Sequence, residues 1–109
     1  MKSIDNPIKV LTMLKQELSA CFKKGNNKFP LAVGIDKEVI AHYENDSRFD
    51  IPTLKKAIEF YCNSTKYLSN VVMNVPRVDI NGKLVSKVTE KEQAHAEKIL
   101  KTRKVKILR

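Results

Sequence analysis

The stretch covering residues 50–79 constrains the fold of this chain most, because it sets a basic, tyrosine-bearing helical surface directly before a tight hairpin. Asp50 and Pro52 are typical of a helix start, and apolar residues then recur at helical spacing across residues 52–62. A separate short helical turn is predicted for residues 65–70. Two consecutive helical segments are therefore expected to lead into the hairpin.

The hairpin is predicted from the pair Asn81 and Gly82, which separates two short strand-like segments at residues 77–80 and 83–86. Both residue types suit the positive φ angles of a two-residue type I′ turn. A small antiparallel hairpin is therefore expected here.

Capping residues and apolar spacing predict the remaining elements. These are a helix over residues 7–23 after Asn6, a helix over residues 37–45 with Asp36 as N-cap, and a last helix from Thr89 to about residue 102, where Thr89 and Glu92 match a capping box. Residues 29–35 are expected to form an ordered loop packed on the core. The predicted fold class is α+β and predominantly helical, with about five helices and a small β-hairpin.

The length of 109 residues predicts one domain, placed at residues 1–102, with a basic tail at residues 103–109. The net charge is +9, and the last twelve residues carry six basic residues and no acid. The remaining 97 residues hold 15 basic and 12 acidic side chains, a net charge of +3. A basic tail on a basic domain favours a polyanionic partner, although surface lysines that only maintain solubility are the plainer alternative for the tail.

The two cysteines, Cys21 and Cys62, lack CxxC spacing and are expected to be free thiols of a reduced compartment. No apolar run approaches the roughly 20 residues of a membrane span, and the N-terminus has no hydrophobic signal core. We expect a soluble, cytoplasmic monomer without a membrane partner.

Catalytic chemistry is not indicated. The two histidines, His42 and His95, form no HExxH arrangement, and neither a GxSxG elbow nor a phosphate-binding loop is present. We expect no enzyme activity, no metal site and no cofactor.

Basic and aromatic residues near the hairpin point instead to nucleic acid. Lys55, Lys56, Lys66 and Arg77 can contact phosphates, and Tyr67 can stack on a base or hydrogen-bond with a nucleotide. The residues alone leave plainer alternatives open, since Tyr67 can pack at the core edge and Arg77 can pair with Asp79. Tyr61, which lies on the apolar stripe of its helix, is expected in the core.

Three motifs in register resemble the ProQ/FinO domain of bacterial RNA chaperones. They are Pro-Leu-x-x-Gly-Ile at residues 30–35, Tyr-x₅-Tyr-Leu at residues 61–68 and Arg-Val-Asp-x-x-Gly at residues 77–82. The resemblance covers nearly everything between residues 8 and 100 and extends to the CFKKGNNKF and VTEKEQAHAEKIL segments.

The resemblance implies a protein that binds structured RNA, in particular a stem followed by a single-stranded 3′ tail, and that stabilises small RNAs or aids their pairing. It implies that the concave face binds RNA, with the start of the third helix near the terminal nucleotides. Matching positions make an RNA-binding set of Thr53, Lys55, Lys56, Lys66, Tyr67 and Arg77.

The chain departs from relatives at three positions: Ala32 and Glu59, where some carry basic residues, and Thr65, where others carry an aromatic one. RNA affinity or preference is therefore expected to differ. Two other hypotheses remain from the residues: a DNA-binding module that uses the third helix for recognition, and a protein-interaction adaptor whose basic face binds an acidic partner.

Overall fold

The computed structural model describes residues 3–25 and 28–103. Five helices and one two-stranded antiparallel sheet are found in this part of the chain, which confirms the predicted α+β class and its helical dominance. The elements are α1 (Pro7–Glu17), α2 (Ile35–His42), α3 (Ile51–Cys62), α4 (Thr65–Val72), β1 (Arg77–Val78), β2 (Leu84–Ser86) and α5 (Glu90–Thr102). Most of the basic tail, residues 104–109, lies outside the described residues.

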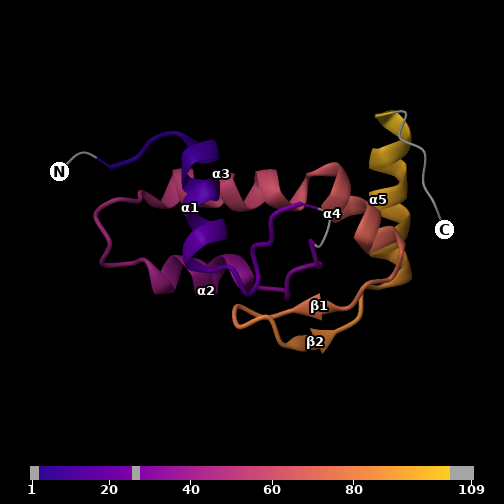
Figure 1. The fold of residues 1–109 in the computed structure, drawn as a ribbon. Coiled ribbons are helices and arrows are strands. Elements are labelled where there is room, and N and C mark those ends of the chain that lie inside the picture. Colours follow the sequence, from indigo (N-terminus) through magenta and orange to yellow (C-terminus); the bar gives the residue numbers. More distant parts are fainter. Residues whose placement is uncertain (1–2, 26–27, 104–109) are drawn as a thin grey trace.

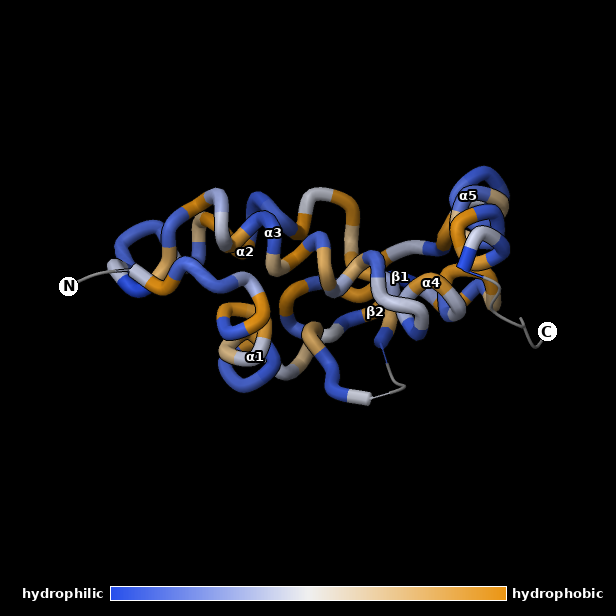
Figure 2. Tube along the Cα trace, turned by 90° about the horizontal axis from the view of Figure 1, so that it is seen from above, coloured by the Kyte–Doolittle hydropathy of each residue, from blue (hydrophilic) through white to orange (hydrophobic). Residues whose placement is uncertain are grey.

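Helix α3 contacts three other helices, α1, α2 and α4. Helix α1 packs mainly against α3, and α4 packs against α5, while α2 makes a smaller contact with α3. In Figure 1, α1 crosses α3 and α2, α5 stands at the end of the molecule beside α4, and the hairpin lies below α4. Hydrophobic and hydrophilic residues alternate along the helices in Figure 2, as expected for helices that bury one face.

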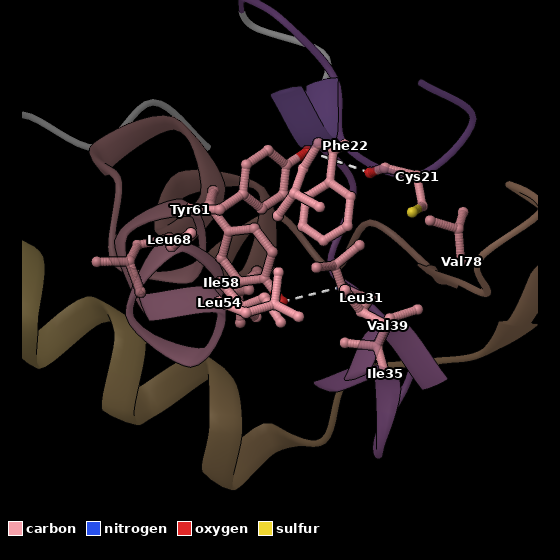
Figure 3. Close-up of a cluster of buried hydrophobic side chains, with 14 of the residues drawn as sticks. Cys21, Phe22, Leu31, Ile35, Val39, Leu54, Ile58, Tyr61, Leu68 and Val78 are labelled. Carbon is pink, nitrogen blue, oxygen red and sulfur yellow. Dashed lines mark hydrogen bonds between the residues drawn. The ribbon is translucent and has the colours of Figure 1, made fainter. Parts of the chain in front are cut away.

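The first helix is shorter than predicted. Asn6 caps it as expected, with its Oδ1 accepting from the Ile8 amide at 2.9 Å, but the helix ends at Glu17 rather than at residue 23. Beyond Glu17 the chain leaves the helix, and the hydroxyl of Tyr61 binds the backbone of residues 21 and 23. The Tyr61 hydroxyl accepts from the Lys23 amide at 2.9 Å and donates to the Cys21 carbonyl at 3.3 Å, as Figure 3 shows for the second bond. These distant contacts replace the last helical turn.

The second helix begins earlier than predicted. It starts at Ile35, and its N-cap is Gly34, which has a φ of +86° and no side chain to form a capping hydrogen bond. Asp36 lies in the first turn rather than at the cap, where its negative charge still favours the helix dipole. The N-cap prediction for Asp36 was wrong because the left-handed glycine lets the chain enter the helix two residues sooner.

Local capping sets the starts of the next two helices. The Asp50 carboxylate accepts from the Thr53 amide at 2.7 Å, and Ser64 Oγ accepts from the Tyr67 amide at 3.3 Å. The fourth helix extends to Val72 instead of residue 70, because Val71 and Val72 continue its buried stripe. The capping box predicted at Thr89 is also present.

The predicted hairpin is present, but its turn is not type I′. Gly82 has a φ of +81°, whereas Asn81 is not among the described residues with positive φ. The Asp79 carbonyl accepts from the Gly82 amide, and the Asp79 carboxylate accepts from the amides of Asn81 and Lys83. Asp79 thus organises a three-residue loop that ends in a left-handed glycine, the other common hairpin connection.

The loop before α2 packs on the core as predicted. Ala32 donates to the Val78 carbonyl at 2.8 Å, and Val78 donates to the Pro30 carbonyl at 2.9 Å, so the segment pairs with β1 on the edge opposite to β2. Leu31 and Tyr61 are buried within the core, where Figure 3 shows them, which confirms the core position expected for Tyr61. Both cysteines are free thiols. None of the described helices is both long and apolar enough to cross a membrane.

Candidate nucleic-acid interface

Tyr67 is an internal residue in this fold. Its side chain is only 7% exposed, and its ring packs edge-on against Tyr61 with centroids 5.7 Å apart. The hydroxyl oxygen accepts from the Leu31 amide at 2.9 Å and also interacts with the Cys62 thiol, and burial raises the pKa of the Tyr67 phenol. Because the ring is buried, Tyr67 offers no stacking surface in this conformation. Its hydroxyl instead ties the loop around Leu31, residues 30–32 (the Leu31 segment), to α4.

Arg77 is internal as well, and its partner is not Asp79. The guanidinium donates from Nη1 to the Leu31 carbonyl at 2.6 Å, and its Nη2 pairs with the carboxylate of Glu92 at the start of α5. The Glu92 carboxylate also accepts from the Thr89 amide, and this bond, followed by the charge of Arg77, holds its pKa below the usual range. Arg77 therefore ties β1 to both the Leu31 segment and α5.

Thr53 lies at the start of α3 and is 8% exposed. Its amide is already bound by the Asp50 carboxylate, whose pKa is lowered first by the Thr53 side chain and then by this amide. A phosphate that used this amide would have to displace a carboxylate. Both the amide and the side chain of Thr53 are therefore already bonded to Asp50 at the start of α3.

The three predicted lysines are exposed, unlike the other members of the set. Lys55 and Lys56 lie on the outer face of α3, and Lys66 lies on the outer face of α4. They are the members of the predicted set whose charges face solvent and can meet a phosphate directly.

A cleft of about 370 Å³ lies beside α3, and Lys55 is one of the residues that line it. Its apolar lining comes from Ile35, Ile58 and Cys62. Asp36 and Glu59 place two carboxylates against the single ammonium group of Lys55. Burial raises the pKa of the Cys62 thiol to about 11, so this thiol is neutral at pH 7. The cleft is thus partly apolar and not basic, because Asp36 and Glu59 together outweigh the charge of Lys55.

Comparison with known proteins decides the family. The ProQ/FinO family pattern matches residues 4–108, nearly the whole chain. The chain belongs to the ProQ/FinO family. The resemblance seen in the three motifs is thereby confirmed.

Individual relatives agree with this assignment. The chain is 33% identical over 98 residues to an RNA chaperone ProQ of Idiomarina loihiensis, covering 90% of this chain and 47% of that protein. It is 28% identical over 110 residues to an RNA chaperone ProQ of Pseudoalteromonas atlantica, and this match covers 95% of this chain and 51% of that protein. The chain spans about half the length of these curated ProQ/FinO relatives.

Solved structures share the fold. The solution structure of a ProQ homologue from Legionella pneumophila superposes with a TM-score of 0.75 at 29% identity, covering 100% of this chain and 96% of that one. The crystal structure of a FinO-like RNA chaperone from Neisseria meningitidis superposes with a TM-score of 0.65 at 23% identity. The superposition covers 91% of this chain and 84% of that one, and it supports the fold alone.

Within this ProQ/FinO domain the predicted residues separate into two groups. Tyr67 and Arg77 converge on the backbone of Leu31, while the exposed lysines lie on the outer faces of α3 and α4. Sequence reasoning missed Leu31 and Glu92 as the partners of the internal pair. The capping box at Thr89 located Glu92 but gave no sign that its carboxylate also reaches Arg77.

Sequence reasoning also missed a basic cluster around Lys28. The Lys28 carbonyl accepts from Asn70 of α4 at 2.8 Å, and its Nζ donates to the Gly25 carbonyl at 2.6 Å. Partial burial lowers the pKa of the Lys28 ammonium, and the charges of Lys15 and Lys66 lower it further. Lys15 and Lys66, from separate segments, thus both act on Lys28, and a loop lysine without a motif gives no sequence signal for this.

Proposed function

We propose that this chain is an RNA-binding protein of the ProQ/FinO type that acts by binding and not by catalysis. It holds structured RNA at a stem followed by a single-stranded 3′ tail, and in doing so stabilises small RNAs or aids their pairing. The observation that carries the proposal is the family match across residues 4–108. The RNA chaperone names of the relatives and the net charge of +9 support it.

The six predicted residues take two roles in this proposal. Lys55, Lys56 and Lys66 neutralise phosphates, because their ammonium groups face solvent. Tyr67 and Arg77 shape the site by fixing the Leu31 segment, since their polar atoms are occupied inside the protein. Thr53 fixes the start of α3 through its bonds to Asp50, and this start lies near the 3′ end of the RNA.

Recognition of a chain end rests on shape and hydroxyl contacts more than on charge. The cleft beside Lys55 has apolar walls, and Asp36 and Glu59 can accept hydrogen bonds from ribose hydroxyls. The same carboxylates repel phosphates, so the RNA backbone is expected to run along the lysines outside the cleft. Glu59 becomes compatible with RNA binding if it meets the hydroxyls of the terminal ribose.

Binding curves for three nucleic acids test the proposal. The ligands are a hairpin with a 3′ uridine tail, the same hairpin with its 3′ end blocked, and duplex DNA, each labelled at the same position. The tailed hairpin with a free end is expected to bind most tightly. Equal affinity for all three would remove end recognition, and tightest binding to DNA would favour a recognition helix. Absence of binding to any of them would favour a protein-interaction adaptor.

A further inference from the structure

Phe60 is the aromatic residue that the fold leaves open. The chain has four phenylalanines and three tyrosines, all within the described residues, and Phe60 alone among them is exposed, at 48% of its surface. Tyr61, its neighbour, is 1% exposed and Tyr67 is 7% exposed. Among the phenylalanines and tyrosines, Phe60 is therefore the ring best placed to stack on a ligand in this conformation.

Phe60 has two cations near it along α3, while the adjacent Glu59 faces the cleft. Lys56 precedes it by four residues, so the two side chains are neighbours on the helix surface and both are exposed. Asn63 follows it by three residues on the same side, and its carbonyl accepts from Nη1 of Arg103 at 2.6 Å. The ring thus lies along a line with a lysine one turn before it and an arginine bound one turn after it.

This line is separate from most of the cleft. Lys55 and Glu59 line the cleft, whereas Lys56 and Phe60 do not. Asn63 belongs to both and marks where they meet. A strand of RNA that leaves the cleft near Asn63 can therefore continue directly over Phe60.

We propose that Phe60 is the base-stacking residue of this domain, taking one nucleobase of an unpaired stretch of RNA while Lys56 and Arg103 neutralise phosphates on either side. The inference rests on the proposed RNA-binding function and extends it to a residue outside the predicted set. An aromatic ring between cations is the recurring arrangement for unpaired nucleic acid, because every base has a face that can stack and every linkage carries a charge. An apolar partner protein would gain nothing from the two flanking cations.

The absence of tryptophan from the chain gives a direct test. Phe60→Trp introduces a single fluorophore at the proposed position, and Ile8→Trp places one on α1 at a residue with a similar exposure of 58%. Each variant is titrated with the hairpin bearing a 3′ uridine tail, while the anisotropy of the labelled RNA reports binding independently. The tryptophan at position 60 is expected to be quenched in step with the anisotropy, and the one at position 8 to stay unchanged.

Truncation provides the second arm. Phe60→Ala and Phe60→Leu are each expected to raise the Kd for the tailed hairpin by about 5- to 150-fold, with unchanged melting temperature because the ring is exposed. Wild-type affinity in the leucine variant would overturn stacking, since leucine keeps apolar contact without a ring. Unchanged fluorescence at position 60 while RNA is bound, or equal quenching at position 8, would overturn it too. Absence of RNA binding by the wild-type chain would instead remove the proposed function itself.

Discussion

Tyr67 and Arg77 bind the two polar groups of the same residue, Leu31. The Tyr67 hydroxyl accepts from the Leu31 amide at 2.9 Å, and Arg77 donates to the Leu31 carbonyl at 2.6 Å. Leu31 itself is 2% exposed, so neither group could find water if its partner were lost. Both residues therefore belong to the framework that holds the loop before α2.

Tyr67→Phe removes the hydroxyl and keeps the ring. It leaves the buried Leu31 amide unsatisfied, and we expect the free energy of unfolding to fall by about 1–3 kcal/mol in urea denaturation. Tyr43→Phe is the matched control, because the Tyr43 hydroxyl donates to Glu17, a carboxylate that keeps its bonds to Arg48. An equal or smaller loss for Tyr67→Phe than for the control would contradict the framework role.

Arg77→Met removes the bond to Leu31 and the charge beside Glu92. The expected loss of unfolding free energy is about 1–3 kcal/mol, most of it from the unsatisfied Leu31 carbonyl, because the Glu92 side chain is 37% exposed and its share is screened. Lys66→Met serves as control, and its stability should change by less than about 0.5 kcal/mol while its RNA affinity falls. A larger loss of unfolding free energy for Lys66→Met than for Arg77→Met would contradict the internal, structural role of Arg77.

Glu92 makes stability depend on acid pH. Its folded-state pKa lies below the ordinary value of 4.5, so its contribution is fully present above about pH 4.5 and is lost as pH falls through the folded pKa. The stability difference between the wild type and Glu92→Gln should therefore shrink when urea denaturation is moved from pH 6 to pH 3. A difference that stays constant over this range would show that the carboxylate charge is irrelevant to the pair with Arg77.

Gly82→Ala tests the hairpin turn. A Cβ at this position would lie 2.7 Å from the Ala20 carbonyl oxygen, in addition to the strain of a φ of +81°. Gly34→Ala carries similar strain at +86° but meets nothing within 4 Å, and it should cost about 1–2 kcal/mol. We expect a larger fall in melting temperature for Gly82→Ala. Equal falls in melting temperature for the two variants would mean that the backbone of Ala20 moves away from the added Cβ at no cost in stability.

Removal of residues 104–109 deletes Lys104, Lys106 and Arg109 but keeps Arg103. If these charges contact phosphates, RNA affinity should fall for all sequences, and the slope of log K against log salt should flatten by up to about 2. Titrations of the same tailed hairpin at several salt concentrations measure this. An unchanged slope would show that the tail does not bind the RNA.

Local signals predicted the parts of the fold that are decided locally. The Asp50 cap and the capping box at Thr89 involve groups within three residues, and both are confirmed. The end of α1 was missed because Tyr61, about 40 residues away, binds the backbone of the turn that follows it. The turn type was missed because the Asp79 carboxylate organises the loop in place of a second left-handed residue.

The candidate site was predicted by residue type and not by exposure. Helical spacing indicates that Lys55 lies away from the buried stripe of α3, but it did not fix which way the short α4 faces. The burial of Tyr67 and Arg77 depends on Leu31, which lies 36 and 46 residues away along the chain. No spacing rule contains such a contact, so the sequence could not separate residues that meet the RNA from those that hold the loop behind it.

Chemical-shift mapping tests the central claim most directly. The ¹⁵N-labelled domain is titrated with a hairpin that carries a 3′ uridine tail, and amide shifts are followed along the chain. The account predicts the largest changes around Lys55, Lys56 and Lys66 on the outer faces of α3 and α4. Largest changes on α1 or the outer strand β2, with these lysines unaffected, would contradict it.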